Sequence, residues 1–202
     1  GDKGPNTGGM GTYAPAPVLT DALRDEAMKT ILEPMVAAME KEGMPYVGCL
    51  YAGLMITDEG PKVVEFNARF GDPETQVVLP LLDSDLGEIM MACAKGTLTS
   101  NMVKWKDSSA ACVILASKGY PETSSKGDVI SGDIKQYDTT IVFHSGTKLV
   151  GENYVTNGGR VLGVVGLGKD LRTALDRAYE RIEHIDFEGM QYRTDIGAKA
   201  FK

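Results

Sequence analysis

The sequence has few of the residues that hold structural metals or form disulfides. Among its 202 residues there are three cysteines and two histidines. The cysteines lie in apolar runs, without a Cys-x-x-Cys pair or a Cys/His cluster, so a zinc site is not expected. An odd number of cysteines in such surroundings is typical of reduced, buried thiols in a reducing compartment. We therefore expect a cytoplasmic protein without structural zinc.

The sequence also lacks an excess of basic residues and a long apolar run. Lysine and arginine together number 21, against 28 aspartates and glutamates, which gives a formal net charge of −7. A nucleic-acid surface would need a basic stripe, and a membrane-spanning helix would need about 20 predominantly apolar residues. We therefore expect neither nucleic acid nor a membrane as a partner. Any phosphate site has to be local, built from backbone amides, a few cations and a metal.

Glycine, in contrast, is abundant: the chain has 24 glycines and opens with the stretch GDKGPNTGGMG. The N–H groups of Gly4, Gly8, Gly9 and Gly11 can form a concave anion site. Tight turns without a ligand would explain the same glycines, and a frayed end is a further alternative. The stretch matches neither the Walker A pattern nor Gly-x-Gly-x-x-Gly. On its own it is weak support for a binding site.

A second stretch, VVEFNARFGDPE, has the residues of a phosphoryl-transfer site. Alternate residues of a β-strand face opposite sides, so Glu65, Asn67 and Arg69 would share one face. The apolar residues would face the core: Val64, Phe66, Ala68 and Phe70. Carboxylate and amide oxygens suit Mg²⁺, which keeps few protein ligands, and a guanidinium beside them can bind a phosphoryl group. Positioning and charge neutralisation of this kind do most of the catalysis in phosphoryl transfer.

A solvent-facing strand at the edge of a sheet explains this alternation equally well from spacing alone. The turn that follows, Gly71-Asp72-Pro73-Glu74, favours the site. Pro73 suits the first turn of a helix that Asp72 would cap. The N-terminus of such a helix favours anions at the end of the strand.

The pattern of apolar residues predicts an α+β fold. A long helix is expected from Thr20 or Asp21 to about Glu42, kinked or broken at Pro34. A hairpin of two strands should follow, with its turn at residues 58–61. Further helices are expected at 74–82, 86–95 and 170–184, and strands at 110–117, 140–144 and 160–168. The Asn-Gly-Gly sequence at 157–159 is typical of a hairpin turn.

Four strings resemble, in the same order, the phosphoribosylamine–glycine ligase family of the ATP-grasp superfamily. They are GDKGPNTGGMGTYAPAP, YVGCLYAGLMITDEGPKVVEFNARFGDPETQ, FHSGTK and VTNGGRVLGVVGLG. The terminal stretch YRTDIG is also similar to the family. The resemblance implies the C-terminal half of an ATP-grasp fold at residues 1–109, mainly an antiparallel sheet with helices on one face. A small α+β C-terminal domain would follow at residues 110–202.

The resemblance also implies a reaction. Members of this family use ATP to join glycine to 5-phosphoribosylamine through glycyl phosphate, which yields glycinamide ribonucleotide, ADP and phosphate in de novo purine biosynthesis. By matching motif, Glu65 and Asn67 would bind the Mg²⁺ or Mn²⁺ of ATP, and Arg69 would be the catalytic contact to the acyl phosphate. The substrate site would be lined by Asp2, Asn6, Thr7, Gly8, Gly9, Pro73 and Glu74. The opening loop should then face the metal ligands across one cleft.

Members of the family are considerably longer than this chain and carry an N-terminal domain and a lid domain before the opening motif. We therefore expect the chain to be a C-terminal fragment that is inactive alone and has those domains as partners. Two alternatives stay open. One is another ATP-grasp carboxylate–amine ligase, and the other is a non-catalytic nucleotide-binding or docking module.

Overall fold

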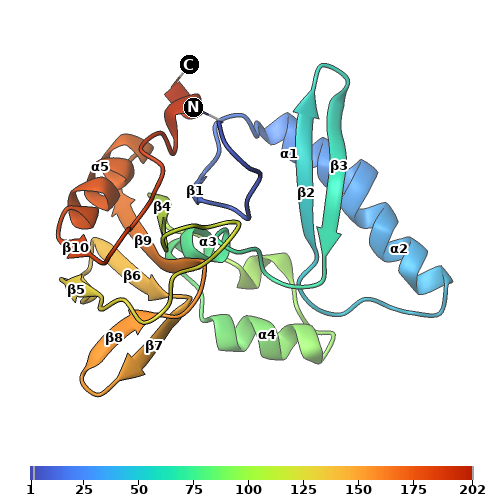
Figure 1. Cartoon of the computed structure of the whole chain (residues 1–202). Helices are drawn as coiled ribbons and strands as arrows, with labels where there is room; N and C mark the ends of the chain where they lie inside the picture. Colours follow the sequence, from blue (N-terminus) through green and yellow to red (C-terminus); the bar gives the residue numbers. More distant parts are fainter. Residues whose placement is uncertain (2, 202) are drawn as a thin grey trace. The chain divides into compact units, whose positions relative to one another are not determined.

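A computed structural model describes residues 1 and 3–201. Contacts between residues divide the chain into two compact units (Figure 1). Unit 1 consists of Gly1–Pro15, Asp72–Leu81 and Asp107–Lys202, and unit 2 of Ala16–Gly71 and Leu82–Lys106. Both contain helices and antiparallel strands, so the predicted α+β class is confirmed. The division of the chain at residues 109 and 110 stays a prediction.

Unit 1 is built on a four-stranded antiparallel sheet in the order β1-β4-β9-β6. Its strands are β1 (Gly11–Ala14), β4 (Ser109–Ala116), β9 (Arg160–Gly168) and β6 (Thr140–His144). Strand β1 pairs with β4, with Gly11 opposite Val113. The chain is therefore anchored in the sheet directly after its glycine-rich opening stretch.

Helices cover both faces of this sheet. The helical elements of unit 1 are α3 (Thr75–Leu81), α5 (Leu171–Ile182) and the 3₁₀ turn η3 (Ala198–Phe201). Strand β4 contributes side chains to the packing on both faces of the sheet. Ile114 packs with Val77 of α3, while Leu115 belongs to the same cluster as Ala178 of α5. Every residue of β4 is therefore buried. This explains why its sequence SAACVILA is almost continuously apolar instead of alternating.

Helix α5 confirms the helix predicted at 170–184. Asp170 caps it, since its Oδ1 accepts a hydrogen bond of 2.8 Å from the N–H of Thr173. The same contact lowers the pKa of Asp170. The helix packs so closely on β9 that a Cβ on Gly166 would overlap the carbonyl oxygen of Ala174.

Two small sheets complete unit 1. They pair β5 (Ser131–Gly132) with β10 (Ile185–Asp186), and β7 (Thr147–Val150) with β8 (Asn153–Thr156). The hairpin turn predicted at 157–159 is wrong, because these residues connect β8 to β9, which lie in different sheets. Strand β9 pairs with β4 on one side and with β6 on the other, so it has no free edge for β8.

Unit 2 begins with a run of three helical segments. They are α1 (Asp21–Ala27), the π-helical segment η1 (Met28–Leu32) and α2 (Glu33–Lys41). Next to Pro34, where a kink or break was predicted, the α-helical hydrogen-bond pattern changes to a π-helical one. The N–H of Glu33 bonds to the carbonyl of Met28, five residues earlier. Pro34 then lies in the first turn of α2, where a missing N–H costs little. No helix in the described part of either unit is long and apolar enough to cross a membrane.

The rest of unit 2 is a hairpin and two short helical segments. These elements are β2 (Tyr51–Thr57), β3 (Gly60–Asn67), α4 (Leu86–Ala94) and the 3₁₀ turn η2 (Ser100–Met102). The hairpin confirms the prediction, but the predicted burial of one face of β3 is wrong. Val64 is 66% exposed, and Phe70 lies beyond the end of the strand with 38% exposure. A sheet of two strands has too little surface to bury a face by itself.

A mostly buried ion pair lies beside α5 in unit 1. Arg181 is only 8% exposed, and its Nη1 lies 2.5 Å from Oδ2 of Asp133. The hydroxyl of Tyr137 donates a hydrogen bond of 2.8 Å to the same carboxylate. The hydrogen bonds from Arg181 and Tyr137 hold the pKa of Asp133 well below its ordinary value.

We predict that Asp133→Asn lowers the free energy of unfolding at pH 7, because the guanidinium of Arg181 loses its carboxylate. The loss should shrink as the pH falls below about 4. A carboxylate whose folded-state pKa is lowered stabilises the fold above its unfolded pKa, and this stabilisation disappears as the folded form is protonated. Urea unfolding from neutral into acid pH measures the difference. Asp21→Asn, at a 90% exposed side chain paired with Arg24, is the control and should change little. An equal loss at neutral and acid pH would contradict this account.

Candidate functional site

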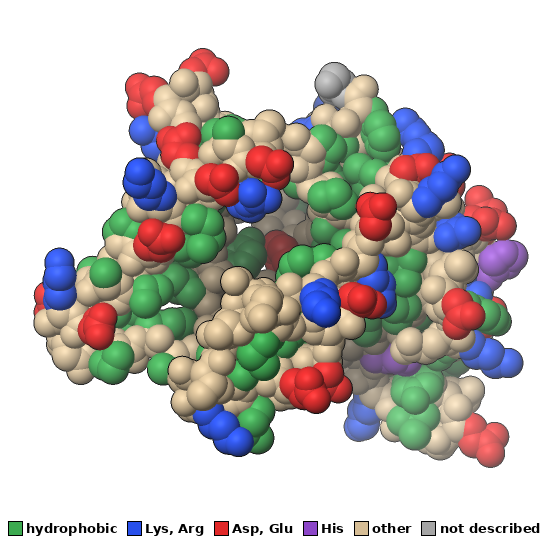
Figure 2. Space-filling model, turned by 180° about the vertical axis from the view of Figure 1, so that it is seen from behind, with side chains coloured by type: hydrophobic (Ala, Val, Ile, Leu, Met, Phe, Trp, Pro, Cys, Tyr) green, Lys and Arg blue, Asp and Glu red, His purple; other side chains and the backbone are tan. Residues whose placement is uncertain are grey.

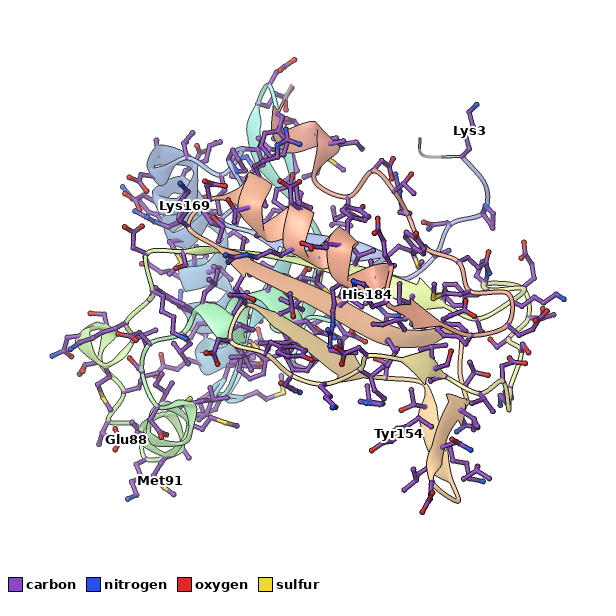
Figure 3. All side chains as sticks on the ribbon, turned by 90° about the vertical axis from the view of Figure 1, so that its left-hand side faces the viewer. Lys3, Glu88, Met91, Tyr154, Lys169 and His184 are labelled. Carbon is purple, nitrogen blue, oxygen red and sulfur yellow. The ribbon has the colours of Figure 1, made fainter. Side chains whose placement is uncertain are left out.

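A cavity of about 380 Å³ lies in unit 1 between the opening loop and residues 191–195. Tyr120 and Pro121 contribute a further side. Of the predicted substrate residues, Thr7 lines this cavity, Asn6 is exposed on the same loop, and Asp2 lies outside the described residues. Figure 3 shows Lys3, another lining residue, on this loop. The surface of this cavity is more polar than apolar, which suits a small polar ligand.

Hydrogen bonds hold the polar side chains of residues 191–195 in place. Nε2 of Gln191 donates to the carbonyl of Ser117 at 2.7 Å. Arg193 donates from Nε and Nη2 to the carboxylate of Asp195 at 2.7 and 2.6 Å. These bonds hold the pKa of Asp195 well below its usual range. In the sequence, residues 191–195 were indicated by the similarity of the stretch YRTDIG to the family described above. No feature of the sequence indicated Tyr120.

Two glycines near the cavity are required by packing. A Cβ on Gly9 would lie 2.5 Å from Cδ of Pro73, and a Cβ on Gly11 would lie 2.6 Å from Cδ1 of Ile196. Both distances are far below van der Waals contact. A Cβ on Gly8 would meet its nearest neighbours at 3.5 Å, which is ordinary contact. Gly9 and Gly11 are therefore needed whether or not the loop binds a ligand.

The turn before α3 differs from the prediction. The helix begins at Thr75, so Pro73 precedes its first turn. The carboxylate of Asp72 accepts a hydrogen bond of 2.8 Å from Nε2 of Gln76. It also accepts one from the guanidinium of Arg160, the first residue of β9. Pro73 is buried and Glu74 is half-buried. Asp72 was predicted to cap the helix. Instead, its carboxylate fixes the turn through hydrogen bonds with the side chains of Gln76 and Arg160.

In unit 2, the side chains of Glu65 and Asn67 touch each other. Nδ2 of Asn67 donates to Oε1 of Glu65 at 2.9 Å, so the two lie on the same side of β3, as predicted. A carboxylate oxygen and an amide oxygen carried by two such neighbouring side chains can bind one Mg²⁺ or Mn²⁺, once the amide oxygen of Asn67 replaces its nitrogen beside Glu65, with the remaining positions left to phosphate oxygens and water. Among the described residues, no group of three or more His, Cys, Asp and Glu side chains is placed to hold a metal.

Arg69 does not continue this row as predicted. It lies in a bend after the end of β3, exposed, and its Nη1 donates to the carbonyl of Phe70 at 2.9 Å. Strand β3 and the opening loop belong to different units. Their meeting across one cleft stays a prediction.

Solved structures of similar fold define the class of this protein. A crystal structure of phosphoribosylamine–glycine ligase from Thermotoga maritima matches 97% of this chain and 48% of its own, with a TM-score of 0.85 and 36% identity. The biotin carboxylase domain of Hydrogenobacter thermophilus 2-oxoglutarate carboxylase matches 91% of this chain and 40% of its own, with a TM-score of 0.66 and 13% identity. This second likeness shows the fold alone. The chain has an ATP-grasp fold.

Sequence comparison narrows the class to a family. Residues 1–75 match the family described as phosphoribosylglycinamide synthetase, ATP-grasp (A) domain, and residues 110–199 match the C domain of the same synthetase. Phosphoribosylamine–glycine ligase of Caulobacter vibrioides is 52% identical over 205 residues. The trifunctional purine biosynthetic protein adenosine-3 of Gallus gallus is 52% identical over 202 residues. The chain belongs to the phosphoribosylglycinamide synthetase family.

The chain spans about half the length of the single-function relatives it matches. The match covers all of this chain but 48% of the Caulobacter vibrioides protein. It covers 99% of this chain and 20% of the longer Gallus gallus protein.

We predict that Gly9→Ala destabilises unit 1 and that Gly8→Ala does not. Overpacking against a rigid ring costs about 1–3 kcal/mol, whereas a substitution at ordinary contact distance changes the free energy of unfolding by less than about 0.5 kcal/mol. Urea unfolding of the two variants measures both values. Equal effects of the two substitutions would show that the contact with Pro73 does not constrain the loop.

Proposed function

We propose that this chain is the C-terminal part of an ATP-dependent ligase that joins glycine to 5-phosphoribosylamine in de novo purine biosynthesis. The observation that carries the proposal is the contact of the Glu65 carboxylate with the Asn67 amide, 2.9 Å apart, on a strand of an ATP-grasp fold. Relatives named phosphoribosylamine–glycine ligase, 51–52% identical over nearly the whole chain, support the choice of substrates.

The proposed reaction has two steps. A carboxylate oxygen of glycine attacks the γ-phosphorus of ATP, the bond to the bridging oxygen breaks, and glycyl phosphate and ADP form. The neutral amine of 5-phosphoribosylamine then attacks the acyl carbon. The bond from this carbon to the phosphate oxygen breaks and the amine loses a proton, which leaves glycinamide ribonucleotide and phosphate. Because the attacking amine is neutral, this step needs no strong base.

Glu65 and Asn67 would hold the Mg²⁺ or Mn²⁺ that neutralises the phosphate oxygens of ATP. Arg69 is exposed, so its guanidinium is accessible to the transferred phosphoryl group. The planar set of N–H donors of a guanidinium suits the oxygens of such a group. The choice between the two metals, like these roles, is part of the proposal.

The cavity of unit 1 would bind glycine and 5-phosphoribosylamine. Thr7 and Tyr120 bring hydroxyl groups to it, and Arg193 brings a cation that suits a phosphate. Asn6, Gly8 and Gly9 lie on the same loop, and Asp2 belongs to the proposal by its motif alone. Pro73 and Glu74 would support the wall from behind the loop, because the ring of Pro73 lies against the backbone of Gly9.

The surface of unit 2 supports the proposal that further domains of the enzyme are partners of this chain. The buried apolar residues of its described part are Ala27 and Ala92. Its large apolar side chains that are more than half exposed are Val18, Met44, Val47, Met55, Val64, Met90, Met91 and Trp105. Figure 2 shows such side chains in green at the surface, and Figure 3 shows Met91 pointing outward from α4. Apolar surface of this extent is usually covered by another part of a protein; the N-terminal and lid domains would cover it. The cytoplasmic location stays a prediction.

We predict that Glu65→Gln in the complete enzyme lowers kcat by about 100-fold or more, because a metal ligand loses its negative charge. Excess Mg²⁺ or Mn²⁺ should restore part of the activity. The assay measures glycinamide ribonucleotide formed from glycine, 5-phosphoribosylamine and ATP. The matched control is Glu59→Gln, in the turn of the same hairpin with an 83% exposed side chain, which should keep wild-type activity.

Two outcomes would favour the alternatives. If the complete enzyme prefers another small carboxylic acid to glycine, it is a different ATP-grasp carboxylate–amine ligase. If it binds Mg-ATP without turning over any acid and amine, it is a nucleotide-binding module. Wild-type activity in Glu65→Gln would contradict the metal assignment itself.

We predict that the isolated 202-residue chain forms no glycinamide ribonucleotide and binds a hydrophobic dye strongly, because unit 2 exposes its apolar side chains. Adding the N-terminal and lid domains as a separate polypeptide should reduce the dye fluorescence. Product formation by the isolated chain would contradict the partner proposal, and so would dye binding as weak as that of the complete enzyme.

A further inference from the structure

Arg160 occupies the first position of β9, beside the candidate substrate loop. Its backbone is held by the sheet, opposite Ala116 of β4, and its carbonyl accepts a hydrogen bond of 2.9 Å from the N–H of Gly146. The side chain is 23% exposed. A guanidinium on such a rigid base has a fixed position and direction.

The guanidinium joins two segments that are distant in the sequence. Nη1 donates to the carbonyl of Gly9 at 3.1 Å and to the carbonyl of Asp72 at 2.9 Å. Nη2 lies 2.7 Å from Oδ2 of Asp72. The two terminal nitrogens of the guanidinium thus bind three oxygens. This uses the planar, forked arrangement of the N–H groups of arginine, which lysine cannot reproduce. Arg160 therefore connects the opening loop with the turn before α3.

This contact fixes a part of the loop that glycine leaves free. Gly8 and Gly9 are exposed, and glycine restricts its own backbone less than any other residue. Because the peptide bond is planar, the hydrogen bond to the carbonyl of Gly9 also fixes the direction of the N–H of Met10, a residue that lines the cavity. Cζ of Arg160 would lie 3.5 Å from a Cβ on Gly8, so the guanidinium also lies beside this residue.

We propose that Arg160 is a positioning residue for the substrate site. It holds the Gly8–Met10 backbone against Asp72, so that the loop presents its N–H groups to the substrates in one orientation. The proposal rests on the proposed function for the substrates, but the anchoring of the loop can be tested without it.

Hydrogen exchange in the complete protein that contains this chain tests the anchoring. Arg160→Gln should speed amide exchange in the peptide covering residues 4–11 and leave the peptides of β4 and α5 unchanged. Arg177→Gln is the control, because this arginine of unit 1 donates to the carbonyl of Leu167, away from the loop. Unchanged exchange in residues 4–11 would overturn the proposal, and so would a uniform rise across unit 1.

Steady-state kinetics of the complete enzyme test the positioning. Arg160→Gln should raise KM for glycine or 5-phosphoribosylamine by about tenfold or more, since hydrogen bonds to a charged group are lost, while KM for ATP stays within about twofold. Arg160→Lys should recover part of the loss, and guanidinium ion should restore activity to Arg160→Gln. A rise in all three KM values to the same extent would overturn the proposal. Faster loop exchange with unchanged KM values would uphold the anchoring and contradict the substrate role of the loop, so the two failures are distinguishable.

Discussion

The burial of β4 on both faces is the constraint on which unit 1 depends. Each of its residues is buried, between α3 on one face and α5 on the other. The two walls of the cavity are attached to this strand as well. Strand β1 pairs with it directly after the opening loop, and Gln191 exchanges two backbone hydrogen bonds with Ala116 at its end, of 2.8 and 3.0 Å. The glycine-rich opening loop can thus keep a defined position, because β1 and residue Gln191 on its two sides are both hydrogen-bonded to this buried strand.

Unit 2 has no comparable core. Its groups suited to a metal lie on a two-stranded hairpin with apolar side chains exposed around it. The unit with the buried core is therefore not the unit with the oxygens suited to a metal. Those of Glu65 and Asn67 lie on unit 2, which has the smaller core. Placing them accurately requires further packing, which supports the proposal that the activity belongs to a longer protein.

The elements with strong local patterns could be predicted from the sequence. Strands β4, β6 and β9 and helix α5 were predicted within a few residues, because long apolar runs and a regular helical stripe leave few alternatives. Wrong predictions occurred where the partner of a segment decided its structure. The turn at 157–159 has hairpin residues, but β9 has no free edge. The kink or break expected at Pro34 does occur, as the π-helical segment Met28–Leu32 that separates α1 from α2. The alternation of β3 predicted a buried face, yet no layer in unit 2 buries Val64.

By itself, the sequence determined the α+β class, the resemblance to a family and the chemistry of Glu65 and Asn67, whose spacing of two on one strand brings their side chains together. These properties depend on local periodicity and on residue type. Only the tertiary structure decided which residues line the cavity and why the glycines are there. Tyr120 and Arg193 line one cavity with the opening loop, and Gly9 and Gly11 are required because a Cβ at either position would collide with Pro73 or Ile196. Such contacts join segments far apart in the chain, so no local pattern contains them.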